Sequence, residues 1–575
     1  MSTPGSTFLV KFAERSAGLG FLFWFALLFV SIGESPETEL MQKVVLFGAL
    51  VVVPLGLSLV ATPDRFERHC SFYRWAVLIQ PVASITAFLS LVVEQGVFAA
   101  LLASPLFILH ILIALFGVWR LLPRGPQPLE EFSIDAGLIF LPIAGFWFVI
   151  YRLGIQLFNF GETIILLTAV HFQFAGFASP IIAGLTGRFL ASQSYPRWVY
   201  NCAVIGLLGG IPFVAIGITF NPLIALVGAS LITIGLVLLA FLVPIWVVPS
   251  INGVSRRVVL AMSALAGLPG MALACVYAFS IFSKTLIIDI PTMARTHGLL
   301  NAFGFTTLAL IVWTTIRPPM RSSQPGIPFT KLNGIGFVGP EYFDRAGAIS
   351  STKTQPRGLV ETFSIFKRND FDTDGVNKIV RAFYEQTADY RLIVRPYWRR
   401  PFRIGGKLVR SFGLRTGQLC LPVETESLES RIASRFLPIA DELDGRLDVR
   451  GWVRTYADTE QAMYVAAYST HQEQRFTYMN IAFPLSLGVL TSVLHLDSLA
   501  SPDSTGVVLS SLFSSSPGGD QGVYYSNRWF SIRLPIDERI KVWPVEGGPV
   551  LQASHEMWFF GKEFLYLEYD IYQIE

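Results

Sequence analysis

The chain has 575 residues, of which 52% are hydrophobic and 15% charged, and its formal net charge at pH 7 is +3. Residues 1–317 contain 28 charged residues, whereas the shorter stretch 318–575 contains 57. This distribution excludes a single soluble domain. A net charge averaged over two such different parts gives no indication of nucleic acid as a partner.

Ten apolar stretches in the first part are each long enough to cross a bilayer, which takes ~20 residues for ~30 Å of hydrocarbon. They are 17–33, 43–62, 74–93, 97–117, 137–155, 163–187, 199–220, 222–247, 258–282 and 293–316. The sequence therefore predicts a multi-pass α-helical membrane domain of about ten spans over residues 1–317. An alternative for 17–33 is a cleaved signal sequence, because Lys11 and Arg15 precede it.

Lys and Arg are unevenly divided between the connections on the two sides of the membrane, with thirteen on one side and three on the other. Arg65, Arg68 and Arg321 are among the thirteen. Cytoplasmic loops retain basic residues. We therefore expect a protein of the cytoplasmic (inner) membrane, with its N-terminus and its C-terminal domain in the cytoplasm. The bilayer is the first expected partner.

Polar side chains interrupt the sixth and tenth predicted spans, where an ionisable group is costly and needs a reason. His171 and His297 both fall in the outer half of spans that run in the same direction, so we expect them to line one pocket. Asn301 follows His297 by four residues and shares its helix face. The pocket candidates are His171, Gln173, Arg295, His297 and Asn301.

Several details of this pocket are open. Arg295 is expected to extend away from His297, toward Asp289, and Gly298 is expected to admit a neighbouring helix. Hydrogen bonding between helices is the alternative for all these groups, and it is the favoured interpretation of His110 in the fourth span. Ligation of haem by two histidines is a further alternative that the spacing does not require.

Two motifs in these spans carry a resemblance to a known family. Residues 171–178 read HFQFAGFA, followed by Pro180 and Gly184, and residues 295–305 read RTHGLLNAFGF. Both resemble signatures of the YndJ-like membrane proteins. The resemblance implies a multi-pass membrane protein and strengthens the choice of His171, Arg295, His297 and Asn301. It supplies no reaction, and a transporter role is implied only by the architecture.

Residues 318–373 are rich in Pro, Gly, Ser and Thr and predict a linker with irregular structure, followed by an α+β, mainly antiparallel-β domain at 374–575.

The literal GxGxxG at 334–339 is not followed by a helix, because Pro340 comes next, so it is not a dinucleotide site. Asp370, Asp372 and Asp374 resemble half of a calcium loop, but the twelfth position holds Arg381 instead of Glu. Asp374 is instead expected to cap a helix.

Period-two alternation from about residue 447 predicts antiparallel strands that form a curved sheet or barrel, with a lipophilic interior as one option. The expected strands are 449–457, 462–470, 474–484, 489–496, 506–513, 522–533 and 549–574. Leu565, Leu567, Tyr569 and Ile571 are expected to face one way. The four cysteines show no paired spacing, so neither a disulfide nor a metal site is expected.

A basic segment precedes these strands. It contains Arg391, Arg395, Arg399, Arg400, Arg403, Lys407 and Arg410, with aromatic residues between them and no acidic residue. Such a segment suits anionic headgroups of the inner leaflet. The alternative is a solvated surface whose charges pair with acidic residues elsewhere in the domain.

Together these patterns predict an integral membrane protein that binds or transports a small lipophilic ligand through a pocket on the sixth and tenth spans. Two alternatives remain open. One is a membrane-embedded enzyme acting on a lipid or isoprenoid, with His171 and His297 as acid and base. The other is a sensor whose C-terminal domain responds to a ligand. The sequence identifies neither a substrate nor a cofactor.

Overall fold

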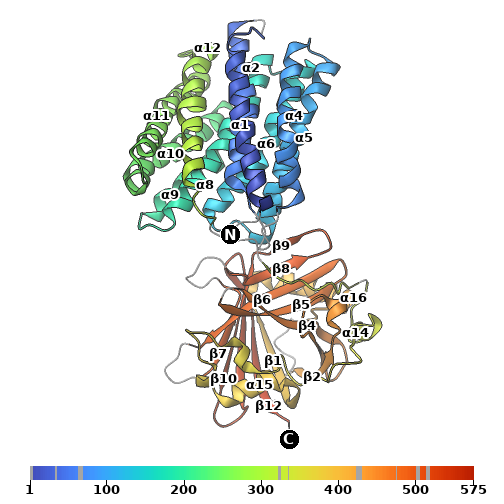
Figure 1. Cartoon of the computed structure of the whole chain (residues 1–575). Helices are drawn as coiled ribbons and strands as arrows, with labels where there is room; N and C mark the ends of the chain where they lie inside the picture. The colour runs from blue at the N-terminus through green and yellow to red at the C-terminus, as the bar shows by residue number, and fades with distance from the viewer. Residues whose placement is uncertain are drawn as a thin grey trace. The chain divides into compact units, whose positions relative to one another are not determined.

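The computed structural model describes residues 4–32, 35–62, 69–320, 326–334, 336–421, 430–473, 475–499, 505–512 and 519–574. Arg65, Arg68 and Arg321 lie outside these ranges. The chain forms two compact units: the first comprises residues 1–121 and 126–324, and the second residues 122–125 and 325–575. The first unit is helical and the second is rich in strands (Figure 1).

The helices of the first unit include several π-helical turns, written η. In chain order the elements are α1 (Pro4–Leu27), α2 (Pro36–Phe47), η1 (Gly48–Val52), α3 (Val53–Val60), α4 (Ser71–Val92), α5 (Val97–Arg124), α6 (Leu129–Leu153), α7 (Glu162–His171), η2 (Phe172–Ala178), α8 (Ser179–Leu190), α9 (Arg197–Phe220), α10 (Pro222–Leu242), η3 (Val243–Val247), the 3-10 turn η4 (Val248–Ser250), α11 (Val254–Ser283), α12 (Ile290–Met293), η5 (Ala294–Gly298), η6 (Leu300–Thr307) and α13 (Leu308–Ile316).

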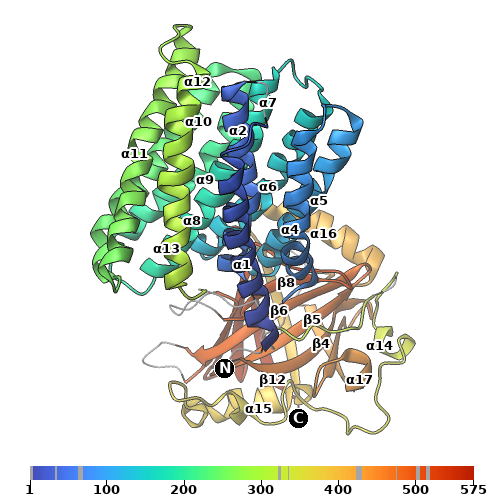
Figure 2. The ribbon, with the colours of Figure 1, turned by 45° about the horizontal axis from the view of Figure 1, so that its top comes forward.

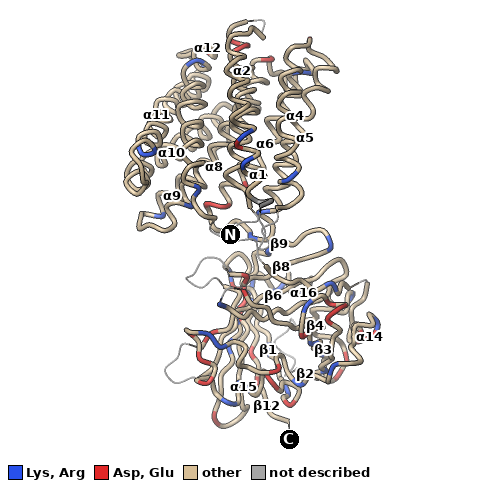
Figure 3. Tube along the Cα trace, viewed as in Figure 1, with Lys and Arg blue, Asp and Glu red and all other residues tan. Residues whose placement is uncertain are grey.

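Among the described residues, nine helical stretches are long and apolar enough to cross a membrane. They are Pro36–Leu59, Ser71–Val92, Val97–Arg124, Leu129–Leu153, Glu162–Leu190, Arg197–Phe220, Pro222–Ser250, Val254–Ser283 and Ile290–Ile316. Each overlaps one of the predicted stretches. Figure 2 shows the last of them, ending in α13, running beside α11, and Figure 3 shows how sparse charged residues are along these helices.

The predicted count of ten spans is not confirmed. Most of the stretch 17–33 belongs to α1, which is not among the nine helices. The first half of α1 carries Lys11, Glu14 and Arg15, and charged side chains oppose burial in hydrocarbon. α1 packs against α2, α3 and α4, and Trp24 Nε1 donates a hydrogen bond of 2.7 Å to a backbone carbonyl of α2.

Four charged side chains from α5, α6 and α8 are buried together within the first unit. Arg120 donates to Asp135 over 2.7 Å and to Glu131 over 2.8 Å. Arg188 donates to both carboxylate oxygens of Glu131, each over 2.7 Å. Arg120 also donates to the Val60 carbonyl at the end of α3 over 2.9 Å. Two positive and two negative groups therefore neutralise one another and hold α3, α5, α6 and α8 in register.

Four α-helices and twelve strands are found in the described part of the second unit. They are α14 (Tyr342–Arg345), α15 (Lys378–Glu385), β1 (Tyr390–Trp398), α16 (Arg403–Thr416), β2 (Ser430–Pro438), α17 (Asp441–Asp444), β3 (Arg450–Tyr456), β4 (Ala462–Glu473), β5 (Phe476–Leu485), β6 (Gly488–Ser498), β7 (Val507–Ser510), β8 (Gly522–Ser526), β9 (Ser531–Arg533), β10 (Ile536–Pro544), β11 (Leu551–Phe559) and β12 (Lys562–Gln573).

The strands form one antiparallel sheet in the order β5-β4-β3-β2-β1-β12-β11-β10-β7-β6-β8-β9, and β5 also pairs with β6. The β5–β6 pairing closes the first ten strands of this order into a barrel. β8 and β9 extend the sheet from the part of β6 that β7 leaves unpaired. The predicted antiparallel β domain is therefore confirmed, and it is a barrel. The sequence did not predict β1, β2 or β10, and the expected single strands 522–533 and 549–574 were wrong, because each is two paired strands in the structure.

Side chains alternate between the two faces of the barrel wall, as the period of two requires. In β12, Leu565, Leu567, Tyr569 and Ile571 are all buried, as expected. α15 and α16 flank the two ends of β1 along the chain and lie at opposite ends of the barrel (Figures 1 and 2).

The N-cap of α15 is Asn377, whose side chain accepts from Ile379 N over 2.8 Å. The predicted cap, Asp374, instead pairs with a lysine.

The buried ion network gives a testable prediction about stability. Replacing Arg120 with Ala leaves buried carboxylates short of positive charge, which costs ~3–5 kcal/mol in comparable cases. We expect Arg120→Ala to lower the thermal unfolding midpoint of the detergent-solubilised protein by several degrees and to reduce its folded yield. Arg256→Ala, which removes an exposed arginine from α11, is the matched control. Equal midpoints for both variants would contradict a stabilising network.

Candidate functional site

The two histidines of the sixth and tenth predicted spans lie side by side. His171 is the last residue of α7 and His297 belongs to η5. Their ring centroids are 6.1 Å apart and the ring planes are inclined by 25°. Asn301 is next to His297 and donates to the His297 backbone carbonyl over 2.8 Å. The structure thus brings three of the five pocket candidates together.

The hydrogen bonds fix the tautomers of both rings. His171 Nδ1 lies 2.7 Å from the Leu167 carbonyl, and His297 Nδ1 lies 2.7 Å from the Gly270 carbonyl of α11. A carbonyl oxygen only accepts, so each Nδ1 carries the proton and each neutral ring has its lone pair on Nε2. Two neighbouring Nε2 acceptors are therefore available to a ligand that donates hydrogen bonds.

The other two candidates have different surroundings. Gln173 is buried against η1, where a Cβ atom added to Gly48 would lie 2.0 Å from Gln173 Oε1. Arg295 forms an ion pair of 2.7 Å with Glu37 of α2, whereas Asp289, its expected partner, caps α12. An anion could reach the Arg295 guanidinium only in competition with Glu37.

Two details of the expected helix packing were wrong. Gly298 has only a backbone atom of its own turn near it; the close approach is at Gly270, where an added Cβ would lie 2.4 Å from Asn301 Nδ2. His110 does not form an interhelical hydrogen bond, because neither ring nitrogen has a partner among the described residues. It is fully buried and packs against Gly145 of α6.

Both sequence motifs coincide with π-helical turns, η2 in the first motif and η5 with η6 in the second. Such turns widen a helix by one residue and are frequent at functional sites. η2 contacts both η1 and η6, so irregular segments of three different spans meet in the bundle. Apolar periodicity does not reveal this irregularity.

A cavity of about 420 Å³ lies inside the barrel. Alternate residues of β3, β4, β5, β6, β10, β11 and β12 form its wall, α15 contributes Phe383 and Tyr384, and α16 contributes Gly405, Gly406 and Val409. Most of the lining side chains are aliphatic or aromatic. Ligand pockets typically have volumes of ~300–1,000 Å³ and a mostly apolar lining, so the cavity has the size and chemistry of a binding site.

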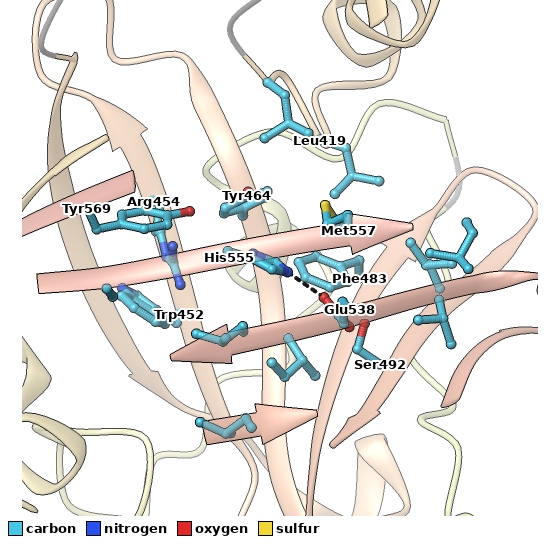
Figure 4. Close-up of a pocket in the computed structure, with 18 of the residues that line it drawn as sticks. Leu419, Trp452, Arg454, Tyr464, Phe483, Ser492, Glu538, His555, Met557 and Tyr569 are labelled. Atoms are coloured by element: carbon cyan, nitrogen blue, oxygen red, sulfur yellow. Dashed lines mark hydrogen bonds and ion pairs between the residues drawn. The ribbon is translucent and has the colours of Figure 1, made fainter. Parts of the chain in front are cut away.

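A few polar side chains point into this apolar cavity (Figure 4). Glu538 of β10 accepts from His555 of β11 over 2.7 Å, and its second oxygen, Oε1, is buried with no hydrogen-bond partner among the described residues. Arg454 of β3 stacks on Trp452, with its guanidinium carbon 3.6 Å from the ring centroid. The sequence did not predict these cavity residues. The available signal was the charged residue at an inward position, which is rare without a partner or a function.

The basic segment divides into two parts in the structure. On β1, Arg395 pairs with Asp570 over 2.7 Å, and Arg391 stacks on Tyr572. Arg399, just after β1, pairs with Glu563 over 2.6 Å. Arg395 and Arg399 thus pair with acidic residues of the same domain, and Arg391 contacts an aromatic ring.

The second part is exposed. It comprises Arg400, Arg403, Lys407 and Arg410, the last three of which are four and three residues apart on α16 and share one helix face. No ion pair joins these four residues to a carboxylate of the described chain. A second face of α16 presents Ile404, Leu408 and Phe412 to solvent, with exposed fractions of 75%, 68% and 60%.

The comparisons with known proteins agree with this architecture. The model of the YndJ-like protein family matches residues 43–305, a range that contains both motifs and most of the membrane helices. The chain is also 29% identical over 555 residues to the uncharacterized membrane protein YndJ of Bacillus subtilis (strain 168), covering 96% of this chain and 97% of that protein. The similarity therefore includes the barrel. No solved structure matches the chain.

The nine apolar helices found where the structure describes the chain, together with the C-terminal antiparallel barrel, define a polytopic membrane protein with an additional β domain. The resemblance that the two motifs carry is confirmed by the family model and by the full-length relative. The chain is therefore similar to the YndJ-like protein family over residues 43–305 and to one of its membrane proteins over nearly its whole length.

Proposed function

We propose that this protein binds a small lipophilic ligand and that the interior of the barrel is the binding site. The observation that carries the proposal is the cavity of about 420 Å³ with its largely apolar wall. Folded domains fill their interiors to a density near that of organic crystals, so an unfilled apolar space of this size is costly unless a ligand occupies it.

The polar groups of the cavity support binding of a ligand with both apolar and polar parts. A water molecule in the cavity finds few hydrogen-bond partners and is therefore weakly bound. An apolar chain that binds there gains ~25 cal/mol of free energy for each Å² of its surface removed from water. Glu538 with His555, and Arg454, provide the few fixed polar contacts that orient such a ligand. The barrel is the part of the molecule in which the expected lipophilic ligand fits best.

A second candidate site is the His171–His297 pair, and the proximity of the two rings, whose centroids are 6.1 Å apart, favours it. In this form of the proposal the ligand crosses the membrane beside the histidines, or the histidines act as acid and base on a lipid or isoprenoid. A sensor would couple ligand binding to the barrel. The membrane-helix and barrel proposals assign the ligand to different residues. One experiment can therefore distinguish between them.

The experiment is mass spectrometry of small molecules that co-purify with the full-length protein. We expect about one lipophilic molecule per chain in the wild type. Ala553→Phe and Ser492→Phe fill the cavity from two different strands and should each remove the molecule, because both side chains line it. Ala346→Phe, at an exposed position in the same unit, is the matched control and should retain it.

The variant His171→Ala/His297→Ala completes the design. Retention of the ligand in this variant, together with its loss in both cavity variants, supports the barrel. Loss only in the histidine variant would transfer the proposal to the membrane helices. Absence of any bound lipophilic molecule from the wild type would contradict the proposal in both forms.

We propose further that the protein lies in the cytoplasmic membrane with both termini in the cytoplasm, on the basis of the thirteen-to-three distribution of basic residues. In that orientation the exposed faces of α16 suit the inner leaflet. A helix with one apolar and one basic face binds the interface of an anionic bilayer, and each basic residue near the surface contributes ~1 kcal/mol. The partner would be anionic lipid headgroups.

This proposal predicts the environment of Leu408. The full-length protein carries Leu408→Cys with an environment-sensitive fluorophore, after the four native cysteines are replaced with Ser, and is reconstituted into vesicles. We expect blue-shifted emission in vesicles that contain phosphatidylglycerol, and a smaller shift when Arg403, Lys407 and Arg410 are changed to Glu, because the reversal repels the headgroups. The shift should also decrease with salt.

The control reverses the exposed residues Lys378, Arg528 and Lys562, which changes the net charge equally at other places in the unit. Its emission should match that of the unreversed protein. Emission that is the same with and without anionic lipid, and that ignores the reversal on α16, would remove the inner-leaflet contact.

A further inference from the structure

Arg454 has unusual surroundings for a charged residue. Its guanidinium carbon lies 3.6 Å from the Trp452 ring centroid and 5.1 Å from that of Tyr464, so the group is stacked against two aromatic rings. It also donates to the Tyr468 hydroxyl over 3.4 Å. All four residues line the cavity of the barrel. The stacking fixes the plane of the guanidinium, and with it the directions in which its N–H groups donate.

This guanidinium has no carboxylate partner. No Asp or Glu oxygen of the described residues lies within ion-pair distance of Arg454, and the acidic residue that lines the cavity, Glu538, is hydrogen-bonded to His555 instead. Arg454 is partly buried, and an arginine beside apolar groups normally has an anionic partner, because removing an unpaired charge from water is costly. A ligand with an anionic group can therefore provide the partner that the Arg454 guanidinium lacks among the described residues.

Hydroxyl donors surround the same point. Tyr464, Tyr468 and Tyr569 line the cavity around Arg454 (Figure 4 labels Tyr464 and Tyr569). Burial raises the pKa of each of these tyrosines above the usual range, so all three hydroxyls are protonated at neutral pH. A planar guanidinium with nearby phenolic O–H groups binds carboxylate or phosphate oxygens through short, charge-assisted hydrogen bonds.

Given the lipophilic site proposed above, on which this inference rests, we propose that the ligand is a single-chain anionic amphiphile whose head group binds Arg454. The chain then lies against the aliphatic and aromatic wall of the barrel. The volume of about 420 Å³ is near the lower end of the ~300–1,000 Å³ range of ligand pockets, which suits one hydrocarbon chain better than two. The head group is a carboxylate, as in a fatty acid, or a phosphate, as in a lysophospholipid.

The test uses photoreactive probes on the full-length protein in phosphatidylcholine nanodiscs. Three probes carry the same sixteen-carbon diazirine chain and end in a carboxylic acid, a lysophosphatidic acid head or an alcohol. Cross-linked peptides are mapped by mass spectrometry, so that probe dissolved in the bilayer does not count. We expect at least one anionic probe to label cavity-lining strands about tenfold more than the alcohol does, as a charge-assisted hydrogen bond predicts.

Variants of the head-group site complete the test. Arg454→Gln should reduce labelling by the anionic probe about tenfold and leave labelling by the alcohol unchanged, and Arg454→Lys, which keeps the charge, should restore part of it. Arg435→Gln, at an exposed arginine of β2 that pairs with Asp344, is the matched control and should have no effect. The two anionic probes show whether carboxylate or phosphate is preferred.

The outcomes separate this inference from the proposal beneath it. Equal labelling of the barrel by the acids and the alcohol, or labelling that ignores Arg454→Gln, would overturn the anionic head group and leave the lipophilic cavity in place. Absence of cavity labelling by all three probes in the wild type would overturn the lipophilic site itself.

Discussion

The pairing of β5 with β6 closes the barrel, and the account of function depends on this closure. Eight residue pairs join the two strands, from Tyr478 opposite His495 to Leu485 opposite Gly488. Closure satisfies the backbone hydrogen bonds at both edges and directs alternate side chains of each strand inward. A ring of ten strands encloses more space than side chains fill, so the wall that gives the domain its core also leaves a cavity.

The two units have different physical constraints on their polar residues. In the helical unit, Arg120, Glu131, Asp135 and Arg188 are buried and pair with one another. In the barrel, Arg454 is stacked on aromatic rings, and no carboxylate of the described residues pairs with it. The buried charges of the helical unit have protein partners and stabilise the fold, whereas the partly buried Arg454 remains available to a ligand under the proposal made above.

The sequence predicted the helices and strands that have a clear hydropathy or alternation pattern. It did not predict the strands in which charged residues interrupt that pattern. Nine apolar stretches and most strands followed from hydropathy and alternation. β1 lay within the segment that was interpreted as a basic surface, although Leu392 and Val394 alternate with its arginines. β10 was missed because charged residues flank Glu538, whose inward position only the register with β11 reveals. The His171–His297 contact was predictable because topology places both spans in the same direction, but the π-helical turns were not, since they depend on tertiary packing.

The most direct test of the central claim is a density map of the full-length protein, purified in its native lipids, at a resolution that shows side chains. The account predicts one elongated density inside the barrel, with its polar end at Arg454 and its length along the apolar wall. A barrel interior that contains only protein side chains and water, in a protein whose helices retain bound lipid, would contradict it.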